Sequence, residues 1–244
     1  MISASRSRLS YRDRRSHQKK RYKFIGIILL VIAAYLLFSV FILQSWLLET
    51  VSMSPNYPVN SRFLVHPYLF RSNTGSLKYP PKRGDLIQIH PSYLKEEPVI
   101  IKIINPVIRF FTFQKVDVRS YKAENWENEY IFKRVIAIPG DTVKMDNFIA
   151  YVKSPDEKFF ISEFEMSGKG YDIQVPQLPE GWKKDMFFSG SMDEVTLKDG
   201  EYFVLGDNRS ASNDSSYRGP VKEKNIKGKV VFFYWPFRVF GLPE

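Results

Sequence analysis

The longest apolar run of the chain lies near its start. Residues 24–43 read FIGIILLVIAAYLLFSVFIL, twenty positions without a charge. A helix of this length, rising about 1.5 Å per residue, spans about 30 Å, the thickness of a bilayer core. We therefore expect residues 24–43 to form a transmembrane anchor. The alternative is a cleaved secretory signal with a small-x-small site at 52–54, but such signals have a shorter apolar stretch of about 7 to 15 residues.

Short β-prone runs follow the anchor, separated by Gly, Pro, Asn and Asp. They are RFLVH, DLIQIH, YIFKRVIAI, DTVKM, FIAYV, EVTL, EYFVLG and KVVFFYW. Such runs indicate strands joined by turns. We therefore expect a mostly β fold, with an antiparallel β domain over residues 44–244. Residues 91–129 and 152–198 interrupt the strand pattern, and we expect insertions there that form a smaller subdomain or long loops.

The segment Pro98–Phe113, PVIIKIINPVIRFFTF, is the second most apolar part of the chain. Four residues interrupt it, namely Lys102, Asn105, Pro106 and Arg109. A second membrane span would need about 20 apolar residues, which this segment lacks. We expect buried strands here, and the alternative is an interfacial loop that dips into lipid.

Charge is concentrated at the N-terminus. The chain has 36 basic and 26 acidic residues, a formal net charge of +10. Residues 1–23, a basic tail, hold nine basic residues and one acidic residue, which is +8, so the other residues carry 27 basic and 25 acidic groups, which is +2. A nearly neutral main part argues against nucleic acid as a partner. A basic flank before an apolar helix predicts a cytoplasmic N-terminus, with residues 44–244 on the external or periplasmic side of the cell membrane and lipid as one partner.

Candidate nucleophiles and bases are few. The chain has no cysteine, which excludes a thiol nucleophile, and its histidines are His17, His66 and His90. His17 lies in the basic tail, and the other two each precede a proline at the end of a strand-like run, so a Ser-His-Asp triad has little support. Two histidines without a close acidic partner also make a poor metal site.

A lysine can replace histidine as the base for a serine when burial lowers its pKa. In YIFKRVIAIPGD, Lys133 and Arg134 point to opposite faces of the expected strand, and both faces are otherwise apolar. The strand is thus expected to be buried, which makes Lys133 a candidate general base. Arg134 cannot lose its charge and needs a carboxylate partner. The pattern alone leaves open that both side chains reach solvent from an edge strand.

Two polar segments complete the candidates. ETVSMSPNY at 49–57 permits three interpretations of Ser52, a turn residue, a cleavage site or a nucleophile. The segment LGDNRSASNDSSYRGPV at 205–221 directly follows an expected strand. Its Asn, Asp and Ser side chains favour a polar loop. Such a loop can also neutralise a buried arginine and bring hydroxyls to a catalytic base.

Five segments in this order resemble type I signal peptidases, membrane-anchored serine proteases with a Ser/Lys dyad. They are SMSP, KRGDLIQI, FKRVIAIPGDTV, GDNRSASNDSSYRG and KNIKGKVVFFYWPF. The resemblance implies a serine endopeptidase that removes N-terminal signal peptides from exported preproteins, its partners, at the outer face of the membrane through an acyl-enzyme. It implies no metal and no cofactor. The competing interpretation is a catalytically degenerate or non-enzymatic anchored β domain that binds exported proteins.

The resemblance also implies roles for single residues. Ser52 takes the place of the nucleophile and Lys133 that of the general base. Thr50 stands where the family often has an oxyanion-hole hydroxyl, the second donor being the Ser52 backbone N–H. Ser212 stands where a serine hydroxyl orients the lysine amine. Asp207 is the expected salt-bridge partner of Arg134.

Other positions match or depart from the family pattern. Met53 and Pro55 are expected to lie near the substrate. Val51 stands where a small residue is common, and Asn56 where threonine is common. Asp214 matches an aspartate that pairs in the family with an arginine.

That arginine is replaced here by Ser216. We expect Arg218, two residues further on, to pair with Asp214 instead.

Overall fold

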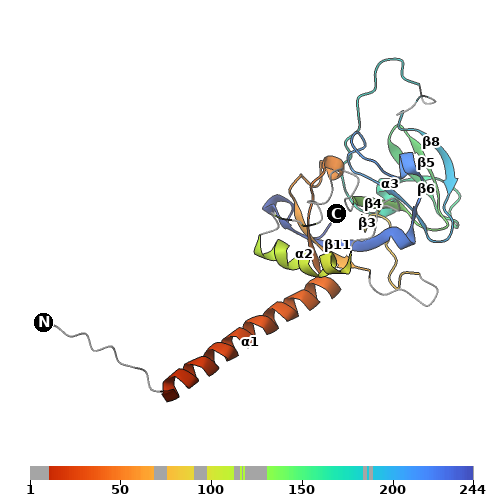
Figure 1. The fold of residues 1–244 in the computed structure, drawn as a ribbon. Helices are drawn as coiled ribbons and strands as arrows, with labels where there is room; N and C mark the ends of the chain where they lie inside the picture. The colour runs from red at the N-terminus through yellow and green to blue at the C-terminus, as the bar shows by residue number, and fades with distance from the viewer. Residues whose placement is uncertain are drawn as a thin grey trace.

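The computed structural model describes residues 11–68, 76–90, 98–112, 116, 118, 131–183, 186 and 189–243. Its first element is α1 (Tyr11–Phe41), a long helix that projects away from the folded domain (Figure 1). The part Gln18–Phe38 is apolar and long enough to cross a membrane, with a mean hydropathy of 2.0, and none of it is buried by the protein. The helix α1 is therefore compatible with a membrane anchor.

Seven strands form the main sheet, in the order β1-β2-β11-β3-β4-β9-β10. They are β1 (Gln44–Leu47), β2 (Arg62–Pro67), β3 (Leu86–Ile89), β4 (Ile131–Ala137), β9 (Glu201–Leu205), β10 (Val221–Lys222) and β11 (Ile226–Trp235). All neighbouring strands are antiparallel. Five predicted runs supply β2, β3, β4, β9 and β11, so the mostly β fold is confirmed.

A second sheet has the order β7-β6-β5-β8 and lies on the side of the domain away from α1 (Figure 1). Its strands are β5 (Thr142–Asp146), β6 (Ile149–Lys153), β7 (Ile161–Ser162) and β8 (Met192–Thr196), and the short helix α3 (Glu163–Ser167) follows β7 directly. Apolar side chains of β4 and β9 pack against those of β5 and β6. The segment predicted as an insertion at 152–198 therefore contributes the strands β7 and β8 to this sheet and also forms the helix α3.

The apolar segment after β3 differs from the prediction, because it forms the helix α2 (Val99–Phe111) where we expected buried strands. Short apolar runs rich in β-branched residues do not distinguish a strand from a helix. The spacing of Asn105 and Arg109 suits a helix, because positions four apart share one face. Most of the remaining expected insertion at 91–129 lies outside the described residues.

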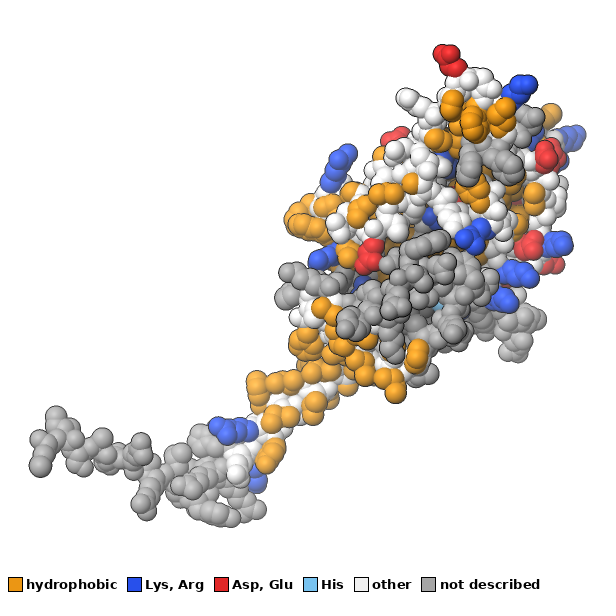
Figure 2. All heavy atoms as spheres, turned by 45° about the horizontal axis from the view of Figure 1, so that its top comes forward, with side chains coloured by type: hydrophobic (Ala, Val, Ile, Leu, Met, Phe, Trp, Pro, Cys, Tyr) orange, Lys and Arg blue, Asp and Glu red, His pale blue; other side chains and the backbone are white. Residues whose placement is uncertain are grey.

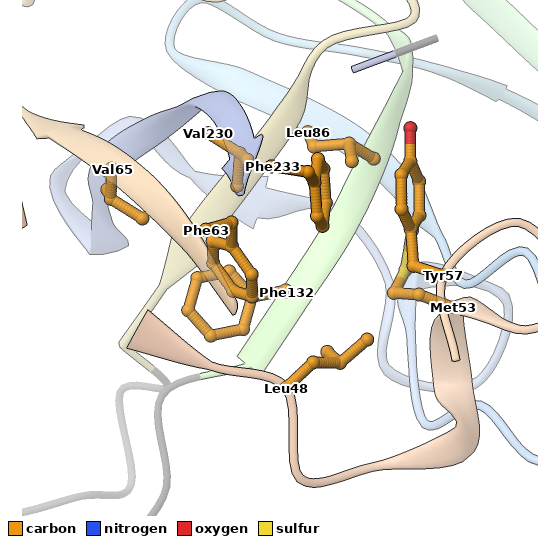
Figure 3. Packing of buried hydrophobic residues seen from close by; sticks show 9 residues of the cluster. All are labelled: Leu48, Met53, Tyr57, Phe63, Val65, Leu86, Phe132, Val230 and Phe233. Atoms are coloured by element: carbon orange, nitrogen blue, oxygen red, sulfur yellow. The ribbon is translucent and has the colours of Figure 1, made fainter. Parts of the chain in front are cut away.

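The core next to η1 (Val51–Met53), a one-turn 3-10 helix, is aromatic. Tyr57 stacks on Phe233 with ring centroids 4.1 Å apart, and Phe63 meets Phe132 edge-on at 4.7 Å (Figure 3). The Met53 side chain packs into the same cluster. These contacts attach the segment around Ser52 to the main sheet. Among the described residues, the other short helices are α4 (Ser215–Arg218), η4 (Glu223–Asn225) and η5 (Phe237–Val239).

Candidate active site

The strand β4 carries the candidate base inside the protein. It pairs with β3 on one side and β9 on the other, so it is not an edge strand. Lys133 is 2% exposed and Arg134 is 0% exposed. The alternative in which the two side chains reach solvent from an edge strand is therefore wrong.

Burial changes the proton affinity of Lys133. It lowers the pKa of the lysine from 10.5 to about 8, and the negative charges of Asp214 and Asp207 raise the pKa by less. The charged ammonium loses its hydration inside the sheet, which favours the neutral amine. At pH 7 about a tenth of the lysine is then neutral, and this fraction rises steeply above that pH. Such a pKa suits a general base that works near neutral pH.

The candidate nucleophile lies in η1, which contacts β4. Ser52 is 6% exposed, while Thr50 and Val51 before it are exposed. The hydroxyls of Thr50 and Ser52 are hydrogen-bonded, with 3.0 Å between their Oγ1 and Oγ atoms. The Ser52 carbonyl accepts the backbone N–H of Asn208 at 3.1 Å, and Asn208 Nδ2 donates to the Val51 carbonyl at 3.3 Å. The turn around Ser52 is thus fixed to the polar loop that follows β9.

Gly206 allows Ser52 and Ser212 to come close to each other. A Cβ atom on Gly206 would lie 2.6 Å from the Ser52 carbonyl oxygen and would also collide with Ser212 Oγ. Real Cβ atoms do not approach a backbone oxygen that closely, so only glycine fits here. At Gly206, the loop after β9 therefore packs against the nucleophile turn on one side and against its own residue Ser212 on the other.

Asp214 organises the far end of this loop. Its carboxylate accepts hydrogen bonds from the Ser212 hydroxyl, from Gly206 N at 2.9 Å and from Ser216 Oγ at 2.7 Å. It also caps α4 by accepting from Ser216 N. Ser216 thus binds the aspartate at the position where the family has an arginine.

The guanidinium of Arg218, which we expected to pair with Asp214, donates through Nε to Asn213 Oδ1 at 2.7 Å. Only its backbone N–H reaches Asp214, donating to the aspartate carbonyl at 3.0 Å.

Arg134 and Asp207 form a bidentate ion pair inside the protein. Arg134 Nε donates to Asp207 Oδ1 at 2.8 Å and Nη2 donates to Oδ2 at 2.7 Å. Asn56 Nδ2 donates to the same Oδ2 at 2.8 Å, and the Tyr171 ring lies 3.9 Å from the guanidinium carbon. Asn56, a departure from the family pattern, therefore holds the carboxylate that neutralises Arg134.

A second buried ion pair, between Arg209 and Glu163, was not predicted. Arg209 Nη1 and Nη2 donate to Glu163 Oε1 and Oε2 at 3.0 and 2.6 Å. The same guanidinium donates to the carbonyls of Gly206 at 2.9 Å and Phe148 at 2.6 Å. Phe148 has a φ of 66°, which is unusual for a bulky residue. Its carbonyl is turned toward the arginine in that conformation. The signal in the sequence was weak, because Glu163 is one of two acidic residues in the segment ISEFEM.

Met53 and Pro55, the residues expected near the substrate, differ in environment. Met53 is buried in the aromatic core cluster, so the structure gives it a packing role. Pro55 is exposed. That either residue lies near the substrate stays a prediction.

Three comparisons place the chain among known proteins. Residues 21–235 match the family described as "Signal peptidase, peptidase S26". The chain is 32% identical over 154 residues to signal peptidase I of Streptococcus pneumoniae, which covers 55% of this chain and 74% of that protein. It is 30% identical over 184 residues to signal peptidase IB of Staphylococcus aureus, covering 73% and 82%. A crystal structure of a signal peptidase I from Enterococcus faecalis V583 aligns with 21% identity, 62% and 97% coverage and a TM-score of 0.30.

These matches define the class of the protein as a peptidase. The family match covers most of the chain, and the chain therefore belongs to the signal peptidase family, peptidase S26. Membership supports the removal of signal peptides as its activity, and the resemblance seen in the five sequence segments is confirmed.

Proposed function

We propose that this protein is a signal peptidase I that cleaves exported preproteins with Ser52 as nucleophile and Lys133 as general base. The observation that carries the proposal is the buried amine of Lys133, with a pKa of about 8, on a strand that η1 contacts. A serine hydroxyl needs a base to become a nucleophile, and a desolvated lysine is one of the few groups that can serve. The buried lysine thereby acquires a chemical use that compensates for its cost in stability.

The chemistry follows from these groups. The substrate binds as an extended strand, and shallow pockets select small residues at the first and third positions before the cut. Neutral Lys133 takes the proton of Ser52 Oγ, which attacks the scissile carbonyl carbon. The tetrahedral intermediate then collapses: the C–N bond breaks, the leaving amine takes the proton from Lys133, and an acyl-enzyme remains. Lys133 next deprotonates a water molecule, which attacks the ester and releases Ser52.

Thr50 supplies the second oxyanion donor beside the Ser52 N–H. Its hydroxyl lies 3.0 Å from Ser52 Oγ in the free protein and rotates toward the substrate oxygen as negative charge develops there. Thr50→Val, which removes the hydroxyl and keeps the shape, is expected to lower kcat by about 10²- to 10³-fold with little effect on KM. Thr50→Ser is the matched control, because it keeps the hydroxyl and should keep most of the activity. An unchanged kcat for Thr50→Val would remove this residue from the mechanism.

Ser212 and Asp214 position the base. Asp214 holds the Ser212 hydroxyl as a donor, which directs the remaining lone pairs of Ser212 Oγ outward from the carboxylate. We assign these lone pairs to the amine of Lys133, whose pKa responds to the charge of Asp214. The loop after β9 thereby orients both dyad residues, Ser52 through Asn208 and Lys133 through Ser212.

The location of the site follows from α1 and the charge pattern. The basic residues before the apolar helix support a cytoplasmic N-terminus. Ser52 follows the end of α1 at Phe41 by a short segment, so it lies close to the external surface of the cell membrane. The cleavage site of an exported preprotein emerges at that surface.

The test is processing of a radiolabelled preprotein by the purified full chain. Ser52→Ala and Lys133→Ala are each expected to abolish cleavage, while Ser210→Ala and Lys222→Ala, at exposed positions, keep it. Unchanged circular dichroism shows that the inactive variants are folded. Cleavage by either dyad variant at the normal rate would contradict the dyad. Binding of the preprotein without cleavage by the natural sequence would favour the degenerate, non-enzymatic alternative.

A further inference from the structure

The helix α2 has its polar and apolar faces in the opposite arrangement to a surface helix in water. Its apolar side chains Ile100, Ile104 and Phe111 are 69%, 47% and 63% exposed. Two of its polar side chains, Asn105 and Arg109, are only 3% and 8% exposed. A surface helix in water normally buries its apolar stripe and exposes its polar one.

The exposed apolar side chains form one stripe. Successive residues of an α-helix are about 100° apart, so Ile100, Ile104 and Phe111 fall within about 40° of one another around the axis. Asn105 and Arg109 lie on the opposite side, facing the folded domain. Asn105 Oδ1 accepts the backbone N–H of Val118 at 2.9 Å. The inward polar face is thus in use, which fixes the apolar stripe outward.

The position of α2 indicates what covers this stripe. The helix contacts α1, and Arg109 stacks on the ring of Trp46 in β1, the first strand after α1, at 5.1 Å. Figure 1 shows α2 lying across the end of α1 where α1 meets the folded domain. Figure 2 shows hydrophobic side chains continuing from α1 onto the adjoining part of the domain. The stripe therefore adjoins the surface that α1 presents to lipid.

We propose that α2 is an interfacial helix that lies in the outer leaflet, with Ile100, Ile104 and Phe111 at the boundary between headgroups and acyl chains. Helices of this kind bind by burying an apolar face at that depth. The inference rests on the anchor assigned to α1 in the proposed function. It adds a second contact with lipid, and two contacts fix the rotation of the catalytic domain about α1, which one helix alone leaves free.

The absence of cysteine from the chain permits a direct test with single labels. Ile104→Cys reports on α2, and Leu30→Cys reports on α1. Phe159→Cys is the matched control, because Phe159 is 77% exposed and lies in the connection between β6 and β7 of the second sheet. Each full-length variant carries a polarity-sensitive fluorophore in nanodiscs of phosphatidylcholine and phosphatidylglycerol. The label at 104 is expected to show blue-shifted emission, quenching by acyl-chain nitroxide lipid and protection from aqueous iodide. The label at 159 is expected to show the reverse.

Three results would overturn the inference. One is quenching by iodide at 104 equal to that at 159. Another is shielding of 104 only after a preprotein is added, which would make α2 a substrate contact. The third is a label at 30 that lipid nitroxide does not quench, because the anchor itself would then be wrong. Repeating the labels with Ser52→Ala separates the questions, since the quenching pattern depends on α2 and cleavage depends on the dyad.

A functional measurement checks the same contact. Ile100→Glu combined with Ile104→Glu puts two charges at exposed positions and is expected to reduce preprotein processing in nanodiscs while cleavage of a short soluble peptide stays unchanged. Phe159→Glu should leave both activities unchanged. Equal loss of both activities in the α2 variant would instead indicate a folding role and contradict the inference.

Discussion

Two buried arginines hold the loop after β9, and they hold it from opposite sides. Arg134 belongs to β4 in the main sheet and binds Asp207 of the loop, whereas Arg209 belongs to the loop and binds Glu163 at the start of α3 beside the second sheet. Both pairs are bidentate and almost fully buried. The loop that touches Ser52 is therefore attached to both sheets at once.

The difference between the pairs lies in what else the arginines contact. Arg209 also donates to the backbone carbonyls of Gly206 and Phe148, while Arg134 donates to the Gly84 carbonyl at 3.3 Å and packs against the face of Tyr171. Tyr171 joins the two systems, because its ring covers Arg134 and its hydroxyl donates to Glu163 at 2.6 Å. Arg134 is 0% exposed and Arg209 is 5% exposed, so the guanidinium of the main-sheet pair is the more deeply buried of the two.

The largest change in the free energy of unfolding is expected for Asp207→Asn. It leaves the guanidinium of Arg134 buried without a counter-charge, which should lower the free energy of unfolding by about 3 to 5 kcal/mol. Urea unfolding of the full chain in detergent measures this. Asp193→Asn, at an exposed position, is the control. If Asp207→Asn lowered the free energy of unfolding by less than Glu163→Gln does, the pair of Arg134 would be the less important of the two for stability.

Lys133→Met should instead raise the free energy of unfolding. Because burial lowers the pKa of Lys133 from 10.5 to about 8, the unfolded chain binds more protons between these pH values, and the natural protein gains stability as pH rises from 8 to 10.5. Below pH 8 the buried ammonium costs about 3 kcal/mol, which the variant avoids. The inactive variant should therefore be more stable at pH 7, with the gain vanishing near pH 10.5. The kcat/KM of the natural protein should rise through pH 8 and then level off. A profile independent of pH would contradict a lysine base.

Glu163→Gln should have the smallest effect and lower the free energy of unfolding by about 2 kcal/mol. Glutamine keeps hydrogen bonds, and Arg209 retains its two carbonyl acceptors. Thermal unfolding measures it. Glu194→Gln, which removes an exposed pair with Lys144 at 3.8 Å, should stay within about 0.5 kcal/mol. Glu163→Gln should also lower kcat/KM at temperatures where the variant is still folded, since the loop that positions Ser52 is released from the second sheet. Full activity at reduced stability would restrict Glu163 to a structural role.

Sequence patterns predicted the strands, in which successive side chains point to opposite faces. The strand YIFKRVIAI was predicted from apolar residues on both faces, and the same pattern singled out Lys133. The pairing of Arg134 with Asp207 came from the resemblance to the family. Glu163 was missed because it lies 46 residues before Arg209 and belongs to none of the five segments that resemble the family, although Arg209 belongs to one of them. The segment Val99–Phe111 was misassigned because its rich content of Ile and Val suits strands, while its tertiary contacts favour a helix.

The junction between α1 and the main sheet is very short. Only Ile42 and Leu43 separate Phe41 from Gln44, and the backbone N–H groups of both residues still donate to the Phe38 carbonyl at the end of the helix. The strand β1 then pairs at once with β2. Under the proposed function, such a junction acts as a fixed spacer that sets the height of Ser52 above the bilayer. A peptidase built in this way would select a bond in its substrate by its distance from the membrane as well as by the side chains around it.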